Sequence, residues 1–372
     1  VAIGNRALQA NTNIGGNVAI GADAMYTNTV GDKCVAVGSD ALKLNTTAVH
    51  CTAIGHSALT ANTTGGNNTA VGKGALDANT TATDNTAMGV DALGANTTAS
   101  ANVAFGSNAL ASNTTGAGLA AFGRQALKSN TTANFNTAIG AEAMDTNTTG
   151  ASNTAVGYAA MDANTTGSQN VAVGRNALVA NTTADNNTAV GFQSLDAVTT
   201  GARNCALGNA TGTNLTTGND NICIGSEACE DLTTGSDNTA IGRLAGQSLT
   251  TGSNNLMLGH NAGRSGSPGV ITSQSNNIVL GDDSISSFKC NVSLTATSDA
   301  RDKTDVESLN MGLNFVNQLN PVTYRWDKRS SYSKDLSVTP DGTHKKSQLM
   351  GGLLAQDVEE IEREYGYKLE QI

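Results

Sequence analysis

The segment Asn153-Thr154-Ala155-Val156-Gly157 is one copy of the pattern that decides the fold. The pattern repeats along most of the chain, and a fixed period determines an architecture before any local assignment does. Its closing glycine recurs every 17 residues through sixteen copies, and a seventeenth ends at Gly281 after an insertion of five residues around 265–273. The sixteen glycines are Gly4, Gly21, Gly38, Gly55, Gly72, Gly89, Gly106, Gly123, Gly140, Gly157, Gly174, Gly191, Gly208, Gly225, Gly242 and Gly259.

Each 17-residue unit has the composition of one rung of a β-solenoid. The stretch Asn-Thr-Ala-Val alternates as a short strand does, and a glycine turn, a second short segment such as Ala177-Leu178 and a polar turn follow it. Stacked rungs place apolar side chains in columns and Asn or Thr in ladders. We therefore predict a mainly β fold, a β-roll of 17-residue rungs over residues 1–282. Glycine is expected where φ is positive or where two backbones approach closely.

A rung this small encloses little core. Only two or three medium apolar side chains are available per rung, and burying each one contributes about 1.5–3 kcal/mol. Aromatic residues make up 3% of the chain, too few for an ordinary globular core of 372 residues. We therefore expect several copies of the chain to associate, although the rung spacing does not fix their number.

The repeats Asn17–Gly21 and Asn153–Gly157 resemble the left-handed β-roll heads of trimeric autotransporter adhesins and the stalk repeats of viral tail fibres. The resemblance covers about residues 1–282. It implies a homotrimer and says little about the binding partner.

The polar positions of the repeat allow three interpretations. Triplets such as Asn62-Thr63-Thr64 match the N-glycosylation acceptor, but they recur because the repeat does. The paired threonines from Thr46-Thr47 to Thr250-Thr251 are compatible with an ice-binding hydroxyl array, which is a remote alternative. We favour the third interpretation, in which these side chains satisfy backbone groups of the turns.

The cysteines and histidines indicate neither a disulfide framework nor a metal site. Cys34 and Cys51 occupy the same repeat position and should be neighbours, and we favour buried thiols over a disulfide. The cysteine pattern fits a reducing compartment. The histidines are scattered, so we expect no metal and no cofactor. The other cysteines are Cys205, Cys223, Cys229 and Cys290, and the histidines are His50, His56, His260 and His344.

Charge and hydropathy exclude two classes of partner. The net charge of −10, with scattered Lys and Arg, argues against nucleic acid. No apolar stretch is long enough for membrane insertion, and no signal segment opens the sequence. Because Val1 lies in the middle of a repeat, we expect the natural chain to begin earlier.

Composition changes near residue 297. Residues 1–297 carry 29 charged side chains and residues 298–372 carry 23, so we place an extended connector at 283–297 and a small α+β domain at 298–372. Thr304 and Glu307 form a capping box for an amphipathic helix that ends before Pro321. Residues 322–327 alternate as a strand, and a second helix carries Val358, Ile361, Tyr365 and Leu369 on one side.

Three motifs in this domain resemble the endosialidase-type intramolecular chaperone found at the end of phage tail spikes and fibres. They are Ser298–Lys303, Asn320–Trp326 and Gly352–Glu359. The resemblance implies that residues 298–372 drive trimerisation and then remove themselves by autoproteolysis. Such domains usually continue into further helix, so we expect the chain to extend past Ile372.

The same resemblance implies a Ser-Lys dyad that acts once. Ser298 would be the nucleophile and Lys303 the general base, with Asp299 and Arg301 in support and the bond from Thr297 to Ser298 as the cleavage site. A lysine serves as a base only when burial or a nearby cation lowers its pKa. A spacing of five requires the two side chains to meet across a turn or between chains. The alternative is that Ser298 and Asp299 only cap a turn.

The leading functional hypothesis is a structural one: a trimeric viral tail-fibre segment, made in the host cytoplasm and carried on the virion. Its partners would be its own copies, a host surface glycan or receptor, and other tail proteins. The alternative is a bacterial surface adhesin of the autotransporter type. A glycan depolymerase finds no support, because no carboxylate pair stands out from the repeat.

Overall fold

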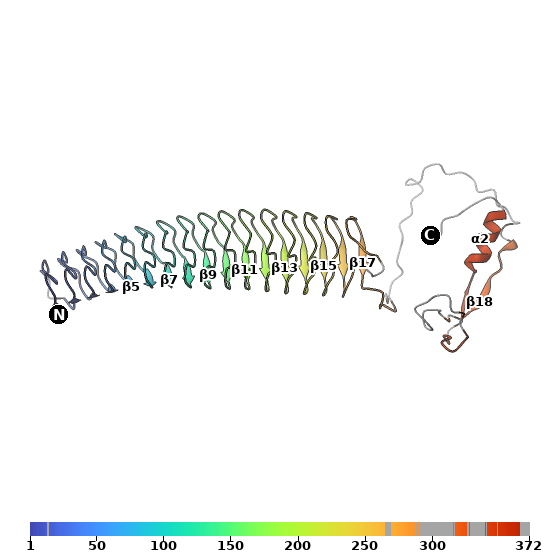
Figure 1. The fold of residues 1–372 in the computed structure, drawn as a ribbon, viewed down its shortest axis with the longest axis horizontal. Helices are drawn as coiled ribbons and strands as arrows, with labels where there is room; N and C mark the ends of the chain where they lie inside the picture. Colours follow the sequence, from blue (N-terminus) through green and yellow to red (C-terminus); the bar gives the residue numbers. More distant parts are fainter. Residues whose placement is uncertain are drawn as a thin grey trace. The chain divides into compact units, whose positions relative to one another are not determined.

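A computed structural model of the chain describes residues 1–12, 15–264, 269–287, 289, 315, 317–325, 327, 339, 341–347 and 349–364. The chain divides into two compact units, Val1–Phe288 and Lys289–Ile372. The first unit is a β-solenoid, as the repeat predicts (Figure 1).

The solenoid contains one sheet of 17 parallel strands, one per rung. Each strand pairs in register with its neighbours in sequence, so that Thr154, Ala155 and Val156 lie beside Val171, Ala172 and Val173. The last pair, β16 and β17, is 22 residues apart, as the insertion requires. The strands are β1 (Ala2–Ile3), β2 (Val18–Ile20), β3 (Val35–Val37), β4 (Thr52–Ile54), β5 (Thr69–Val71), β6 (Thr86–Met88), β7 (Val103–Phe105), β8 (Ala120–Phe122), β9 (Thr137–Ile139), β10 (Thr154–Val156), β11 (Val171–Val173), β12 (Thr188–Val190), β13 (Cys205–Leu207), β14 (Ile222–Ile224), β15 (Thr239–Ile241), β16 (Leu256–Leu258) and β17 (Ile278–Leu280).

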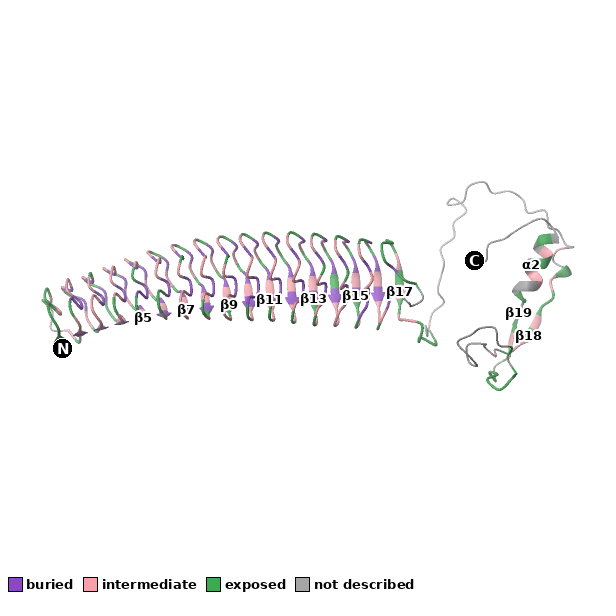
Figure 2. Cartoon of the chain, viewed as in Figure 1, coloured by how far each residue is buried: buried purple, intermediate pink, exposed green. Residues whose placement is uncertain are grey.

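The interior of the solenoid is lined by small residues and one column of larger ones. Buried residues recur from rung to rung along the solenoid (Figure 2). In the rung of Gly72, the strand residue Ala70 is buried together with Ala75 and Leu76, while Thr69 and Val71 face outward. The Val and Ile positions of the strands therefore contribute little to the chain's own core. Alternation along the strand separates these two faces, but it does not say which face is enclosed.

The segment after each glycine forms a turn and contains no strand. Its Leu or Met lies in the left-handed region, with φ of 53° at Leu76 and 52° at Met144. This conformation disfavours β-branched residues, which explains why Val and Ile are missing from that column in the first twelve rungs.

The repeated glycine is required by close contact between rungs. Gly89 has φ of 141°, and a Cβ atom placed on it would lie well under 3.0 Å from the carbonyl of Gly106 in the next rung. The same approach recurs along the shaft, so a side chain at this position would push two rungs apart.

Two ladders of buried asparagines join the rungs. In the corner ladder, each amide nitrogen donates to the preceding rung's asparagine and to a turn carbonyl, as Asn113 does to Asn96 (3.1 Å) and to Gly116 (2.9 Å). The corner ladder ends at Asn181, whose buried Oδ1 has no partner because Val198 follows it. Its members are Asn28, Asn45, Asn62, Asn79, Asn96, Asn113, Asn130, Asn147, Asn164 and Asn181.

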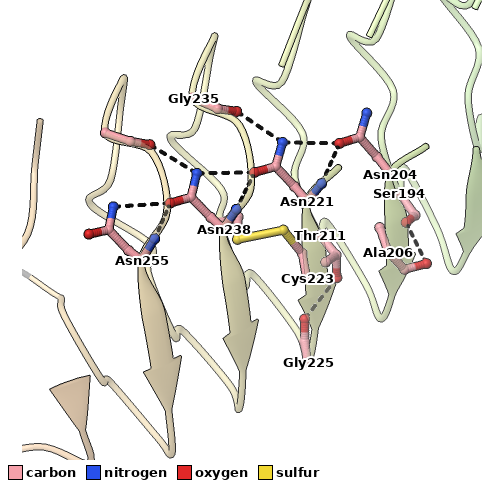
Figure 3. Close-up of a disulfide and its surroundings, with 12 residues drawn as sticks. Ser194, Asn204, Ala206, Thr211, Asn221, Cys223, Gly225, Gly235, Asn238 and Asn255 are labelled. Carbon is pink, nitrogen blue, oxygen red and sulfur yellow. Dashed lines mark hydrogen bonds between the residues drawn. A yellow bond between two sulfur atoms is a disulfide. The ribbon is translucent and has the colours of Figure 1, made fainter. Parts of the chain in front are cut away.

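The strand ladder lies at the residue before each strand. Asn221 accepts the backbone N–H of Asn238 and donates to the carbonyl of Gly235, at 3.1 and 2.9 Å (Figure 3). Cys34 and Cys51 occupy two positions of this ladder as free buried thiols, which confirms the predicted neighbours and their reduced state. The sulfur of Cys34 accepts the N–H of Cys51 at 3.4 Å, so a thiol replaces the amide.

In the last rungs, the large apolar side chain moves from the Leu or Met column to the column of the corner ladder. Where Gly212, Gly246 and Gly263 replace the buried Leu or Met, the position of the corner ladder carries Leu215, Leu249 and Ile271. One column loses a large side chain and the other gains one, so the interior of the rung stays filled.

The remaining rung of this group holds a disulfide. The expectation that the cysteines are those of a chain in a reducing compartment is therefore wrong for this pair. Cys223, in the middle of β14, is bonded to Cys229, which takes the Leu or Met position of its rung (Figure 3). Their Cα atoms are 6.0 Å apart, within the usual range for a disulfide. The bridge crosses the core of one rung.

The second unit contains β18 (Val322–Tyr324), β19 (Met350–Gly352) and α2 (Ala355–Glu364). β18 and β19 are antiparallel, with Tyr324 opposite Met350. The predicted strand is therefore found at Val322–Tyr324, and the predicted second helix is found as α2 up to Glu364. Phe315, Asn317 and Gln318 are helical, where the first helix was expected.

Replacing Gly89 with alanine should destabilise the shaft by about 2–4 kcal/mol, because the new Cβ has no space and φ is positive. Gly94→Ala is the matched control. Other rungs carry Asp77 or Ala111 at that position, so its effect should stay within about 1 kcal/mol. Denaturant unfolding followed by circular dichroism measures both, and equal effects would contradict the close-contact explanation.

Candidate functional site

The predicted catalytic residues lie outside the described part of the chain. These are Thr297, Ser298, Asp299, Arg301 and Lys303. Their mutual geometry therefore stays a prediction, and the dyad and its cleavage site are untested by the structure.

The described part of the same domain shows how its second and third motifs meet. Tyr324 of the Asn320–Trp326 motif packs over Gly352, the first residue of the Gly352–Glu359 motif; a Cβ atom on Gly352 would lie 3.5 Å from the tyrosine ring. The carboxylate of Asp327 accepts the backbone N–H of Gly342 at 2.8 Å, which ties the loop before β19 to the residues after β18. Two of the three motifs thus belong to one local structure.

The structure decides between the interpretations of the polar ladders. The asparagines of the Asn-Thr-Thr triplets, such as Asn62, form the corner ladder and are fully buried, so they are not glycosylation acceptors in the folded shaft. The first threonine of each pair donates its hydroxyl to the next rung, as Thr63 does to the carbonyl of Thr80 at 3.1 Å. The interpretation that these side chains satisfy turn backbone groups is confirmed for this column.

Two of the histidines contact neighbouring polar side chains. His56 hydrogen-bonds Ser57 at 3.1 Å, and His260 lies 3.3 Å from the carboxylate of Asp282. Within the residues that the structure describes, no group of three or more His, Cys, Asp or Glu side chains is placed to hold a metal ion.

The most extensive surface feature is an apolar stripe along the strands, which we call the strand stripe. It consists of the last residue of each of the 17 strands, and every one of these side chains is apolar and faces out of the solenoid. Several are well exposed in the single chain, including Ile139 at 43% and Leu207 at 47%. The stripe residues are Ile3, Ile20, Val37, Ile54, Val71, Met88, Phe105, Phe122, Ile139, Val156, Val173, Val190, Leu207, Ile224, Ile241, Leu258 and Leu280.

The bulkiest part of the strand stripe lies near its middle. Phe105 and Phe122 stack there with their ring centroids 5.1 Å apart and their planes 7° from parallel. An uninterrupted apolar stripe of this length is unusual on the surface of a soluble monomer, and such patches mark sites of association.

A second surface feature is a column of carboxylates on the turn side of the rungs. Asp145 and Asp162 occupy equivalent positions in adjacent rungs, and Lys128 lies 3.9 Å from Asp145. Burial raises the pKa of Asp162, and the carboxylates of Asp145 and Glu142 raise it further. Burial also raises the pKa of Asp145.

The comparisons with known proteins add one finding. The family model described as the chaperone of endosialidase matches residues 298–367. Comparison with curated proteins and with solved structures gives no significant match. In the described residues, no helix is long and apolar enough to cross a membrane. The chain therefore joins a β-solenoid to a segment similar to the endosialidase chaperone.

The raised pKa of Asp162 predicts a pH-dependent effect of Asp162→Asn. A carboxyl whose pKa is higher in the folded state favours folding at low pH, and this contribution is lost as the pH rises through the folded-state pKa. The substitution should therefore raise the melting temperature at pH 7, and the gain should vanish near pH 3, below the ordinary aspartate pKa of about 3.9.

The control is Asp220→Asn, which should have the opposite sign. Arg203 pairs with Asp220 at 2.6 Å and lowers its pKa, so this carboxylate favours folding at neutral pH. Its replacement should slightly lower the melting temperature at pH 7, and this loss should shrink as the pH falls through the lowered folded-state pKa of Asp220. Parallel pH profiles for the two variants would refute the assignment.

Proposed function

We propose that this chain is a structural segment of a trimeric viral tail fibre or spike that attaches to a host surface and carries its own assembly domain. The observation that carries the proposal is the match of residues 298–367 to the endosialidase chaperone, directly after a β-solenoid shaft. In this proposal the chain is made in the host cytoplasm and becomes part of the virion, where it contacts other tail proteins. A fibre needs an elongated shaft and a means of aligning its chains during assembly, and the solenoid and the chaperone segment would supply these.

The strand stripe supports self-association. Seventeen outward apolar side chains in one line lose water when they pack against the same stripe on other copies. An interface that repeats every rung binds strongly once aligned, but it also tolerates misalignment by whole rungs. A domain that brings three chains together at one end reduces the entropic cost of alignment and suppresses misassembly.

The proposal includes a single self-cleavage. Ser298 Oγ would attack the carbonyl carbon of Thr297 while Lys303 takes the hydroxyl proton. The Thr297–Ser298 C–N bond then breaks, Lys303 returns the proton to the Ser298 amine, and Thr297 is held as an ester on Ser298 Oγ. Water hydrolyses this ester, which frees the shaft with a carboxylate at Thr297 and restores the Ser298 hydroxyl. One cut per chain separates assembly from the finished fibre, so the domain has no turnover activity.

The alternative is a bacterial surface adhesin of the autotransporter type, which shares the shaft. The chaperone match favours the viral fibre over this alternative. Ice binding is disfavoured, because one threonine of each pair is engaged in bonds between rungs.

The trimer predicts a specific effect of charge in the strand stripe. The double variant Phe122→Asp, Ile139→Asp should remain folded by circular dichroism but fall from trimer to monomer in light scattering, because two buried carboxylates per chain are costly in an apolar interface. Ser152→Asp is the control, since aspartate occupies the same repeat position at Asp84 and Asp220. A wild-type chain that is a stable monomer would contradict the proposal.

The cleavage predicts two fragments, separated between Thr297 and Ser298, when the full-length gene is expressed. Ser298→Ala and Lys303→Ala should each give one intact chain that still trimerises, and intact-mass spectrometry distinguishes the products. Cleavage that survives both substitutions would exclude this dyad. An uncut wild-type trimer would remove the peptidase activity from the proposal.

A further inference from the structure

A third group of side chains lies just beyond the glycine turn, in the column formed by the residue after each repeated glycine. Elsewhere in the shaft this column holds mostly small, polar or basic residues, such as Ala22, Ser107 and Arg243. Three successive positions of the column are Tyr158, Arg175 and Phe192. We call these three residues, together with Arg124 of the same column and Glu142 of the next column, the aromatic ridge.

The aromatic ridge exposes rings that the rest of the fold does not need. Tyr158 is 50% exposed and Phe192 is 41% exposed, in a chain with only 3% aromatic residues. Because β10, β11 and β12 pair in register, Tyr158, Arg175 and Phe192 follow one another at one rung spacing, about 4.8 Å. The Arg175 guanidinium carbon lies 5.7 Å from the centre of the Phe192 ring.

Polar contacts hold one end of the ridge in place. Arg124 pairs with the Glu142 carboxylate. The same carboxylate raises the pKa of the Tyr158 hydroxyl, so the phenol and the carboxylate are neighbours. A side chain held by such a contact loses less freedom when a ligand binds. Glu142 itself is held in the left-handed conformation by its rung, with φ of 61°.

The positive charge of Arg175, which lies between Tyr158 and Phe192 in the column, can bind an anion. Arg124 is engaged by Glu142 and Gln125, whereas none of the described carboxylates lies within ion-pair distance of Arg175. Arg175 therefore presents a cation between two exposed rings on a chain with a net charge of −10. A guanidinium in this setting is suited to a planar carboxylate, which it can bind through two parallel hydrogen bonds.

We propose that the aromatic ridge binds an acidic oligosaccharide, with the faces of sugar rings on Tyr158 and Phe192 and a sugar carboxylate on Arg175. Exposed aromatic faces accept the apolar faces of sugars, and their polar edges leave the hydroxyls in water. The next column supplies Asn176 and Gln193, whose amides donate to and accept from hydroxyls. This proposal rests on the proposed host-attachment function and specifies the chemical class of the ligand.

The ridge uses different positions from the strand stripe. The stripe residue precedes the repeated glycine and the ridge residue in the same column follows it.

The test is isothermal titration calorimetry of the full chain with trigalacturonic acid, trimannuronic acid and a hyaluronan tetrasaccharide. Binding of at least one is expected, and the methyl ester of the bound saccharide, which lacks the carboxylate charges, should bind about tenfold more weakly or worse. Arg175→Gln and Phe192→Ser should each weaken binding by about tenfold or more. Serine already occupies the Phe192 position in other rungs, for example at Ser107, so this variant should fold.

Arg243→Gln is the matched control, because it removes the same charge from the same column between Ser226 and His260. Its affinity should stay within about twofold of wild type. Absence of binding to all three saccharides, or binding that survives Phe192→Ser, overturns the ridge proposal. If the ridge variants bind the saccharide as tightly as the wild type and the trimeric chain adheres to cells, the ridge proposal is wrong and the attachment function stands. If a monomeric chain binds the saccharide through the ridge, the ridge proposal stands and the trimeric-fibre proposal is wrong.

Discussion

The shaft depends on one contact, the approach of the repeated glycine to the carbonyl of the glycine in the next rung. No side chain fits there, so the glycines must coincide in every rung, and this requirement sets the 17-residue register. Once the glycines coincide, the strands pair in register, and each side chain stacks on the equivalent side chain of the next rung. The two asparagine ladders follow from this alignment, because an amide can bond its equivalent one rung away only when the equivalent positions stay in register. The five residues inserted before β17 keep this register, since Asn277 still bonds Asn255.

The same alignment separates the tasks of the side chains. Inward positions hold Ala, Leu or Met and Asn, which close a narrow core within one chain. Outward positions are free to vary, and yet the last residue of each of the 17 solenoid strands is apolar. This feature recurs in 17 rungs without contributing much to the chain's own interior, and contacts with other copies are the role that we propose for it. The variable column after the glycine, by contrast, concentrates its aromatic residues in a few rungs, which is the distribution expected of a local binding site.

The sequence predicted the solenoid, its rung length and the neighbours Cys34 and Cys51, because all three follow from the period alone. It did not predict which strand face is enclosed, since burying asparagine while exposing valine runs against ordinary hydropathy and needs the ladder bonds to be favourable. The left-handed leucines, the exchange that pairs Gly212 with Leu215 and the Cys223–Cys229 disulfide depend on packing across a rung, which spacing does not encode. Tyr324 and Gly352 belong to motifs that are far apart in the sequence, and only the fold brings them into contact. The assignment of Ser298 and Lys303 as a catalytic dyad depends on the family resemblance alone.

The claim that register governs the fold is tested most directly by comparing two internal deletions. Removing residues 136–152 takes out one whole rung and joins Phe135 to Asn153, which recreates the native sequence pattern of Phe135 followed by asparagine. Removing residues 136–151 leaves one residue too many. The account predicts that the whole-rung deletion melts cooperatively within a few degrees of wild type, while the shorter deletion melts far lower or fails to fold. Similar melting temperatures for the two deletions would contradict it.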